Sequence, residues 1–378
     1  MLKIKCIQEI CLEETKKHKG ESHLQMKKII SIIVPSFNME RLLEKDLSSL
    51  IVPKPLLESV EVIVVNDGSK DKTIDIAREF ENKYPGIFVT IDKQNGNYGS
   101  CINAGLKKAN GIFVKVLDAD DSFITTNFEQ MIEYLTSSER NGENVDLFFF
   151  NWRYVNEKDT VIKELSFNIP PNKVIDISNA YDIGYFRDIQ HHAIVYRTSF
   201  LKDHNYYQTE GISYTDTEWI YKPLLYVKRI KYFPVTVYSY LFGRQDQSMS
   251  PTQKAKGFKS MLTVEQSMLD TYLKHKGKVA PVNEELFKNK FVSNIGYLYL
   301  NYLIAYPSKE TKKALKEFDD SLKDNCIEIY DAVGLLTTEK PKIKYVKSFR
   351  KNQNSIKLKI TVAYYKFRKF VKRCLKKY

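Results

Sequence analysis

The chain has 378 residues, of which 43 % are hydrophobic, so it is long enough to bury one large core or two smaller ones. Its five cysteines are scattered and include no C-x-x-C pair, which excludes a disulfide framework and a zinc ribbon and favours a reducing compartment. The net charge is +13, yet no stretch reaches the roughly 20 apolar residues of a membrane span or resembles a signal peptide.

Short β-branched runs alternate with amphipathic stretches over the first part of the chain, after a polar leader at residues 1–26. Four strands are expected, at Ile29–Val34, Val60–Val65, Ile87–Ile91 and Ile112–Leu117. Helices are expected from about Glu40, from near Asp71 and over Tyr98–Ala109. This alternation predicts an α/β fold with a parallel sheet and crossover helices.

The rest of the chain changes character near residue 250. Before that point we expect strands at Val145–Phe150 and Ala193–Tyr196, a helix at Thr217–Val227, and two edge strands at Lys231–Phe233 and Val235–Phe242. Beyond it the pattern is helical, with helices expected at Phe258–Leu273, Glu284–Ile304 and Lys309–Leu322. The predicted regions are therefore an α/β domain at 27–250 and a helical region at 251–340.

Three polar turns follow the predicted strands. They are P-S-F-N (Pro35–Asn38), N-D-G-S (Asn66–Ser69) and D-A-D-D (Asp118–Asp121). Ligands bind outside the carboxyl ends of the strands in parallel α/β sheets, so these turns are expected to form one site. Asp118 and Asp120 offer the oxygen ligands that a hard divalent cation prefers, although an acidic turn that merely closes a strand is the competing interpretation.

Two of these features have further interpretations. Asp67 is suited to accept hydrogen bonds from a base or from ribose, but the same turn also fits a plain helix start capped by Ser69 or Asp71. The glycine-rich segment Asn95–Gly105 opens a helix, yet it follows the third strand and lacks the G-x-G-x-x-G spacing. A dinucleotide fold and a P-loop are therefore not supported.

Taken together, four motifs resemble those of the family-2 glycosyltransferases. They are V-P-S-F-N (Val34–Asn38), V-N-D-G-S-K-D-K-T (Val65–Thr73), N-Y-G-S-C-I-N-A-G (Asn97–Gly105) and V-L-D-A-D-D (Val116–Asp121). The resemblance is strong to about residue 125 and weaker to about residue 250. It implies the GT-A fold, a mostly parallel sheet flanked by helices, as in bacterial enzymes that make capsule, exopolysaccharide or cell-wall polymers.

The resemblance also implies roles for single residues around a nucleotide-sugar donor, with a UDP-sugar favoured. The positions that match the nucleotide-sugar pocket are Pro35, Ser36, Phe37, Glu40, Asp67, Lys93 and Asp118. Asp120, with Asp118, matches the ligands of a Mn²⁺ or Mg²⁺ ion, which stabilises the charge on the departing diphosphate.

An inverting transferase also needs a base that takes the proton of the acceptor hydroxyl. Family members usually place an E-D or D-D pair at the start of a helix, and the corresponding segment here is Glu210–Trp219. Asp216 matches the aspartate of the pair, but Thr215 stands where the other acid is expected, so either Asp216 or Glu218 is the candidate base, with Asp216 favoured. A purely structural helix cap at Asp216 is compatible with the same position.

Three residues are expected to contact the acceptor or the diphosphate. Arg244 is expected to meet the diphosphate, and Trp219 to stack on a sugar ring. His192 belongs to the H-H-A-I-V-Y-R segment, for which a polar core role is the alternative.

The positive charge is concentrated at the end of the chain. Lys342–Tyr378 contains 14 Lys and Arg and no acidic residue, which leaves 45 basic against 46 acidic residues elsewhere. Apolar residues recur there at helical spacing, at Ile360, Tyr364, Phe367, Val371 and Leu375. Residues 341–378 are therefore predicted to form a basic amphipathic tail that binds an anionic membrane surface, with packing on the protein itself as the alternative.

The sequence thus predicts a metal-dependent, inverting hexosyl- or N-acetylhexosaminyltransferase. Its acceptor is expected to be a hydroxyl of a glycan or lipid-linked glycan in bacterial surface polysaccharide synthesis, at the inner face of the cell membrane. A basic nucleic-acid-binding protein and a nucleotidyltransferase are the alternatives. The neutral body argues against the first, and the absence of a glycine-rich, basic loop after the first strand argues against the second.

Overall fold

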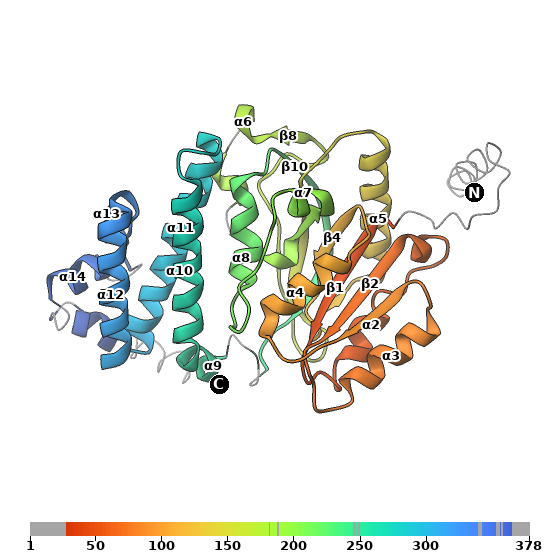
Figure 1. Ribbon diagram of the computed structural model, residues 1–378, viewed down its shortest axis with the longest axis horizontal. Helices are drawn as coiled ribbons and strands as arrows, with labels where there is room; N and C mark the ends of the chain where they lie inside the picture. The colour runs from red at the N-terminus through yellow and green to blue at the C-terminus, as the bar shows by residue number, and fades with distance from the viewer. Residues whose placement is uncertain are drawn as a thin grey trace.

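The computed structural model describes residues 28–180, 182–186, 189–244, 247, 250–338, 342–352, 356 and 358–364. The predicted leader at 1–26 lies outside these residues. A sheet with helices packed around it forms one part of the molecule, and a group of helices forms the other (Figure 1).

The first part of the sheet is parallel and is centred on β1 (Ile30–Ser36). Its order is β3 (Phe88–Asp92), β2 (Val60–Asn66), β1 and β4 (Phe113–Val116). β1 and β2 pair in register from Ile30 opposite Val60 to Ser36 opposite Asn66, so their two polar turns begin at the same level. The prediction of a parallel sheet is confirmed for these strands, and the β-branched residues of β1, β2 and β4 are buried on both faces.

The helices between these strands are α2 (Leu43–Ser48), α3 (Thr73–Lys83) and α4 (Asn97–Lys108). The second part of the sheet is mixed. β9 (Ile194–Arg197) runs antiparallel between β4 and β6 (Leu147–Val155), and β10 (Arg229–Leu241) runs parallel to β6. The remaining strands are the short β5 (Ser122–Phe123), β7 (Val161–Leu165) and β8 (Val174–Asp176), and α5 (Thr125–Arg140) covers this part of the sheet.

Two details differ from the sequence prediction. The two predicted edge strands around residues 231–242 are one interior strand, β10, whose register shifts between Phe233 and Thr236. Pro234 lies in this irregularity, where the missing N–H removes no regular ladder bond. The helix predicted at Thr217–Val227 ends early: α8 spans Asp216–Tyr221, and a 3₁₀ turn at Lys222–Leu225 contains Pro223.

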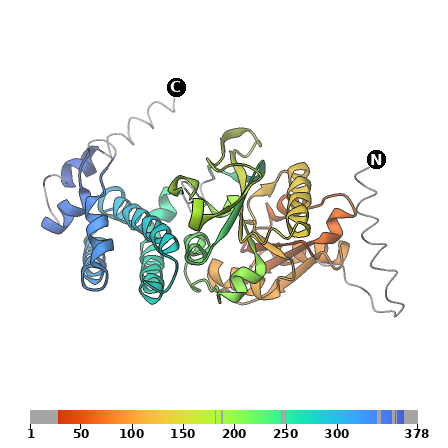
Figure 2. The same ribbon diagram turned by 90° about the horizontal axis from the view of Figure 1, so that it is seen from above.

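The helical part begins with α9 (Pro251–Lys256), α10 (Phe258–His275) and α11 (Pro281–Tyr299). A π-helical turn at Leu300–Ala305 follows, and then α12 (Lys309–Asn325), α13 (Ile327–Leu335) and α14 (Tyr345–Lys351). These helices enclose a hydrophobic core of their own, distinct from the core around the sheet. α10 and α11 lie on the side of this group that faces the sheet, and α8 stands next to them (Figures 1 and 2).

The first part of the predicted tail packs against this second core. Tyr345, Val346 and Phe349 of α14 are buried, and the Tyr345 hydroxyl donates to the carbonyl of Gly296 on α11 at 2.9 Å. Arg350 donates to both carboxylate oxygens of the buried Asp319 on α12. Farther along, Ile356 and Ile360 are exposed, whereas Phe367, Val371 and Leu375 lie outside the described residues. None of the helices in the described part of the chain is both long and apolar enough to cross a membrane.

Candidate active site

Asp118 leaves β4 at its carboxyl end and is held by two neighbours. The Tyr98 hydroxyl of α4 donates to its Oδ1 at 2.8 Å, and His191 Nε2 lies 3.0 Å from its Oδ2. Burial alone raises the pKa of Asp118, but the charge and hydrogen bond of His191, together with Tyr98 and Lys115, outweigh it and hold the pKa below its usual range. Asp118 is therefore a fixed carboxylate that keeps a partly exposed face, since 23 % of its side chain is accessible.

Asp120 and Asp121 have different surroundings. Arg244 Nη2 lies 2.7 Å from Asp120 Oδ2, which brings the two predicted residues together as a largely buried ion pair. Asp121 instead accepts hydrogen bonds from the Tyr238 hydroxyl at 2.6 Å and from the backbone N–H of Leu241 at 2.7 Å. Asp121 thus fastens the turn to β10, whereas Asp120 is held by the Arg244 side chain.

A divalent cation fits the carboxylates of this turn. Asp118, Asp120 and Asp121 place one oxygen each within 4.8 Å of one another. Both oxygens of Asp118 and both of Asp121 have hydrogen-bond partners, but Asp121 is only 4 % exposed, whereas 23 % of the Asp118 side chain is accessible to a ligand. Burial and the nearby Asp118 charge raise the pKa of Asp120 to about 6, so the two carboxylates repel each other at this distance. A cation bound by oxygen ligands of this kind relieves that repulsion, which makes Asp118 and Asp120 the candidate metal ligands.

A further acid, Asp46 of α2, lies beneath this turn and was not singled out from the sequence. Its side chain is fully buried, and among the described residues neither carboxylate oxygen has a hydrogen-bond partner. Burial, followed by the charges of Asp120 and Asp118, raises the pKa of Asp46 well above its usual range. Asp46 is therefore a neutral acid, which lets it stay beside the two carboxylates without adding a third negative charge.

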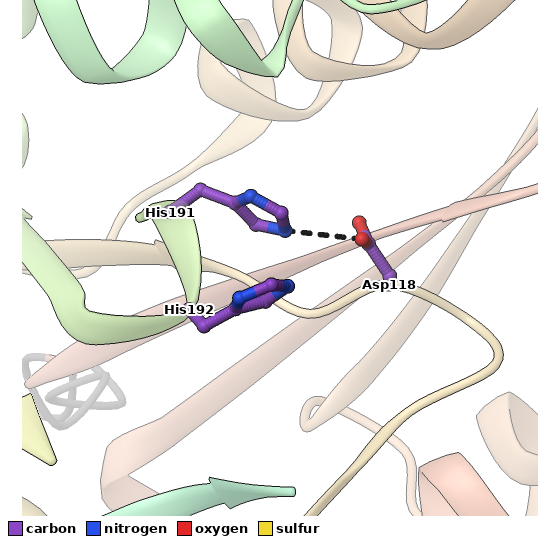
Figure 3. Close-up of side chains that lie close together, drawn as sticks. All are labelled: Asp118, His191 and His192. Carbon is purple, nitrogen blue, oxygen red and sulfur yellow. Dashed lines mark hydrogen bonds and ion pairs between the residues drawn. The ribbon is translucent and has the colours of Figure 1, made fainter. Parts of the chain in front are cut away.

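The position of the two histidines, His191 and His192, follows from the pairing of β9 with β4. Val114 pairs with Tyr196 in an antiparallel ladder, and continuing that register brings residue 192 level with Asp118. The buried Lys115 ammonium donates to the carbonyls of His192 at 2.6 Å and Ile194 at 3.2 Å, which secures the segment ahead of β9. Figure 3 shows both imidazole rings beside Asp118, with His191 directed at its carboxylate.

The histidines differ in environment. His192 is 6 % exposed and packs among the rings of Trp152, Tyr238 and Tyr240, at centroid distances of 4.6 to 4.8 Å. Burial lowers the pKa of His192 well below its usual value, so it is neutral, and its ring sits under the site rather than in the open part of it. His191 is the histidine that contacts the site residues, which the sequence analysis had not assigned although it is the neighbour of His192.

The candidate base Asp216 begins α8 on the other side of His191. His191 Nδ1 lies 4.0 Å from Asp216 Oδ2, so one imidazole stands between Asp118 and Asp216. Burial lowers the pKa of His191, but the charges of Asp118 and Asp216 outweigh it and raise the pKa overall. Burial raises the pKa of Asp216, and His191 opposes that rise; 38 % of the Asp216 side chain is exposed.

The two other predicted residues on α8 do not reach this site. Glu218 is fully buried, its oxygens accept from the backbone N–H and the hydroxyl of Thr209, and Lys222 lies 3.1 Å away, so it is not placed to act as the base. Trp219 is 1 % exposed and packs edge-on against Tyr196 and Tyr206. The prediction that Trp219 stacks on a sugar ring is wrong, because the ring is a core residue.

The residues that match the nucleotide pocket lie at the ends of β1 and β2. Lys93 Nζ lies 2.6 Å from Asp67 Oδ1, which also accepts from the backbone N–H of Gly96 at 2.9 Å. Phe37 is 44 % exposed, and with Lys93 it lines a surface cavity of 550 Å³. A larger cavity of 950 Å³, lined by Glu40, Asp120 and Arg244 among others, lies on the other side of the β1 turn. Pro35 is half-buried, and Ser36 is buried, with its hydroxyl donating to the carbonyl of Val34.

The N-Y-G-S segment contains a glycine that the packing of α4 requires. A Cβ on Gly99 would lie 2.1 Å from the carbonyl oxygen of Thr209, so only glycine lets α4 approach the segment that leads to Asp216. The same approach places Tyr98 against Asp118. Tyr98 stands inside a motif that the sequence analysis quoted, but its contact to Asp118 depends on this close packing.

Comparisons with known proteins match part of this chain to glycosyltransferases. The model of the family described as glycosyl transferase family 2 matches residues 31–204. The minor teichoic acid biosynthesis protein GgaB of Bacillus subtilis is 38 % identical over 104 residues, which are 28 % of this chain and 12 % of that protein. The poly(ribitol-phosphate) beta-N-acetylglucosaminyltransferase TarS of Staphylococcus aureus is 25 % identical over 221 residues, which are 58 % of this chain and 36 % of that protein. The chain thus spans less than half of the length of these curated relatives.

The fold comparison covers more of the chain. The crystal structure of S. aureus TarS 1-349 in complex with UDP-GlcNAc matches with a TM-score of 0.62 at 18 % sequence identity, over 89 % of this chain and 91 % of that one. At this identity the match shows the fold, including the helical part after the sheet. Residues 31–204 therefore match the glycosyl transferase family 2 model, and the chain has the fold of the TarS structure, which is a GT-A fold.

Proposed function

We propose that this protein transfers a sugar from a UDP-sugar to a hydroxyl group of a cell-wall or surface glycopolymer, with inversion at the anomeric carbon. The observation that carries the proposal is the placement of His191 between Asp118 and Asp216. Because of it, the carboxylate at the end of β4 and the candidate base at the start of α8 are held on either side of one imidazole, and 23 % and 38 % of their side chains are accessible to substrates.

In the proposed reaction the acceptor oxygen forms a bond to the anomeric carbon while the bond from that carbon to the diphosphate breaks. Asp216 takes the proton of the attacking hydroxyl, and the nucleoside diphosphate leaves with the electron pair of the broken bond. The carboxylate of Asp216 is partly exposed and lies at a helix N-terminus. It is suited to take this proton, because the helix dipole favours the charged form of a base at that position. His191 holds Asp118 and Asp216 at a fixed separation.

Asp118 and Asp120 would hold a Mn²⁺ or Mg²⁺ ion. Such an ion, when bound, stabilises the negative charge that develops on the departing diphosphate. Arg244, which is paired with Asp120 at the same turn, is proposed to contact the diphosphate. Phe37 and Lys93 are proposed to bind the nucleoside because they line the cavity next to the end of β1, and Asp67 is proposed to act with them because its carboxylate is paired with Lys93.

The printed names of the relatives support the donor and acceptor classes. The matched staphylococcal structure is a complex with UDP-GlcNAc, and the curated relatives act in teichoic acid biosynthesis or on poly(ribitol-phosphate). A hexosyl or N-acetylhexosaminyl donor and a wall-polymer acceptor are accordingly proposed for this chain.

We also propose that the end of the chain binds an anionic membrane surface. Ile356 and Ile360 are 74 % and 54 % exposed in a stretch rich in lysine, and this combination of exposed apolar and basic side chains suits a lipid headgroup boundary. Sedimentation with anionic and neutral vesicles, for the full chain and for a chain ending after Asn352, which keeps α14 and its bonds to Asp319, tests the assignment. Equal binding of the two chains contradicts it.

The function is tested with the full-length protein and a panel of UDP-, GDP- and dTDP-sugars, with Mn²⁺ or Mg²⁺ present. Thermal shifts report donor binding, and release of the nucleoside diphosphate reports turnover. We expect stabilisation and slow hydrolysis with at least one UDP-sugar, and neither with the metal chelated. Binding and turnover that are indifferent to every nucleotide-sugar would contradict the proposal.

A further inference from the structure

A third cavity opens on the far side of Asp216, between the sheet domain and the helical part. It has a volume of 440 Å³, within the range of small-molecule sites, and its walls come from α8, α10 and α11. Asp216 and Thr217 form one wall, Glu265 of α10 a second, and Ser293, Asn294 and Tyr297 of α11 a third. The cavity therefore joins the candidate base to a surface that lies outside residues 31–204, where the family model matches.

The side chains that line this cavity are unusual for an interface between two hydrophobic cores. Glu265 is only 3 % exposed, its Oε1 accepts from the Asn294 side-chain amide, and among the described residues its Oε2 has no hydrogen-bond partner. Leaving a buried polar group unpaired is destabilising, so such a group inside a cavity points to a ligand that completes it. Its buried environment keeps the carboxyl protonated, so it offers both a donor and an acceptor.

The mouth of the cavity carries an exposed aromatic ring. Tyr297 is 39 % exposed and follows Asn294 by one helical turn, so the two side chains share a face of α11. A flat aromatic ring beside hydroxyl and amide groups is suited to a molecule with apolar ring faces and polar edges. Among the residues that line the cavity the ionisable groups are Asp216, Lys290 and the neutral Glu265, and Lys290 donates to the carbonyl of Phe186. Without an excess of positive charge the cavity does not favour an anion.

The loop that leads to Asp216 is held against the helical part as well. Tyr214 adopts a positive φ of 67°, which is uncommon for a residue other than glycine, and its ring lies against Gly257 at the start of α10. A Cβ on Gly257 would lie 2.4 Å from this ring, so the contact requires glycine. The position of the candidate base therefore depends on its packing with the helical part.

From these observations we propose that the groove between α8, α10 and α11 is the acceptor site, and that it takes an uncharged, hydroxyl-rich unit such as a sugar ring or an alditol. Hydroxyls of the acceptor bind Glu265 and Asn294, its apolar face packs on Tyr297, and the reacting hydroxyl points at Asp216. This inference rests on the proposed function, since it assigns the second substrate of the same reaction.

The test uses two size-matched variants of the full-length protein. Ser293→Trp fills the groove from an exposed position of α11, and Thr263→Trp adds the same bulk on an exposed position of α10 outside the groove. Saturation-transfer NMR measures binding of methyl β-D-glucoside, methyl N-acetyl-β-D-glucosaminide and ribitol, with UDP and Mg²⁺ in the same tube as a probe of the donor site. We expect at least one of the three probes to bind the wild type and Thr263→Trp, and its signal to fall at least tenfold in Ser293→Trp with the UDP signal unchanged.

Two results overturn the groove assignment: an unchanged probe signal in Ser293→Trp, or wild-type protein that binds UDP and none of the three probes. A different result contradicts the proposed transfer reaction: the wild type does not bind UDP, yet it binds a probe that Ser293→Trp no longer binds. In that case the groove is a glycan-binding site. With a competent donor, Tyr297→Ala is expected to raise the KM for the acceptor about tenfold while the KM for the donor stays constant. Equal changes in both constants contradict the acceptor role of Tyr297.

Discussion

Replacement of Glu265 by glutamine is expected to change how the stability of the protein depends on pH. Burial raises the pKa of this carboxyl from 4.5 to about 8, with the Asn294 hydrogen bond opposing the rise. The folded protein therefore keeps a proton that the unfolded chain has lost between pH 4.5 and about 8. In that window the folded state binds more protons than the unfolded state, so the free energy of unfolding falls as the pH rises.

The magnitude follows from the width of the window. Each pH unit is worth about 1.4 kcal/mol, so a window of three to four units amounts to roughly 4–5 kcal/mol at most. Glutamine has nearly the same shape and stays neutral. We expect Glu265→Gln to match the wild type near pH 4.5 and to be more stable than it by several kcal/mol at pH 9.

Urea denaturation at pH 5, 7 and 9 gives the free energy of unfolding for the wild type and the variant. Glu285→Gln on α11, an exposed position, is the control and should follow the wild type at every pH. If the free energy of unfolding changed with pH in the same way for the wild type and Glu265→Gln from pH 5 to pH 9, Glu265 would not be a buried neutral acid. The groove would then lack the neutral carboxyl that is proposed to bind the acceptor.

Three further predictions concern the metal turn and the two cores. Arg244→Met removes the cation that is paired with Asp120 at 2.7 Å, so calorimetric titration is expected to show Mn²⁺ binding on the order of tenfold tighter, and weaker binding would contradict the proposed competition. Arg350→Ala leaves the buried Asp319 carboxylate without its two guanidinium bonds, which is expected to cost about 3–5 kcal/mol in chemical denaturation, and a loss below 1 kcal/mol would refute the buried ion pair. Trp219→Ala is expected to lose about 3–5 kcal/mol of stability, whereas Trp219→Phe keeps most of it and leaves the acceptor KM unchanged; a raised KM in the phenylalanine variant would restore the sugar-stacking role.

The sequence predicted those parts of the fold that depend on local pattern. β1, β2 and β4 lie where their β-branched runs were found, and the turns that follow them meet at one edge because parallel strands align their carboxyl ends. The strand at 229–241 was harder, because Pro234 interrupts the pattern at a point where the sheet tolerates a register shift. Local rules for proline predict a break there, and only the pairing with β6 shows that the strand continues.

The site residues that the sequence analysis missed depend on long-range contacts. His191 reaches Asp118 because β9 runs antiparallel to β4, a register that no local motif records. Tyr98 reaches it because Gly99 lets α4 pack closely on the segment at Thr209. In the chain, β2, β3 and β4 lie between Asp46 and Asp120. The residues around Asp46 therefore give no sign that it is buried close to this turn. Trp219 was misassigned for the same reason, since the sequence near a predicted base does not distinguish a buried aromatic residue from one that binds a substrate.

The central claim is that Asp216 is the base of a sugar transfer. The most direct test measures transfer by wild-type protein and by Asp216→Asn with the UDP-sugar found in the donor panel, together with the donor dissociation constant of each. A general base contributes about 10²–10⁴-fold to the rate, so kcat is expected to fall at least a hundredfold in the variant while donor affinity is unchanged. An asparagine variant that transfers at near wild-type rate would contradict this account.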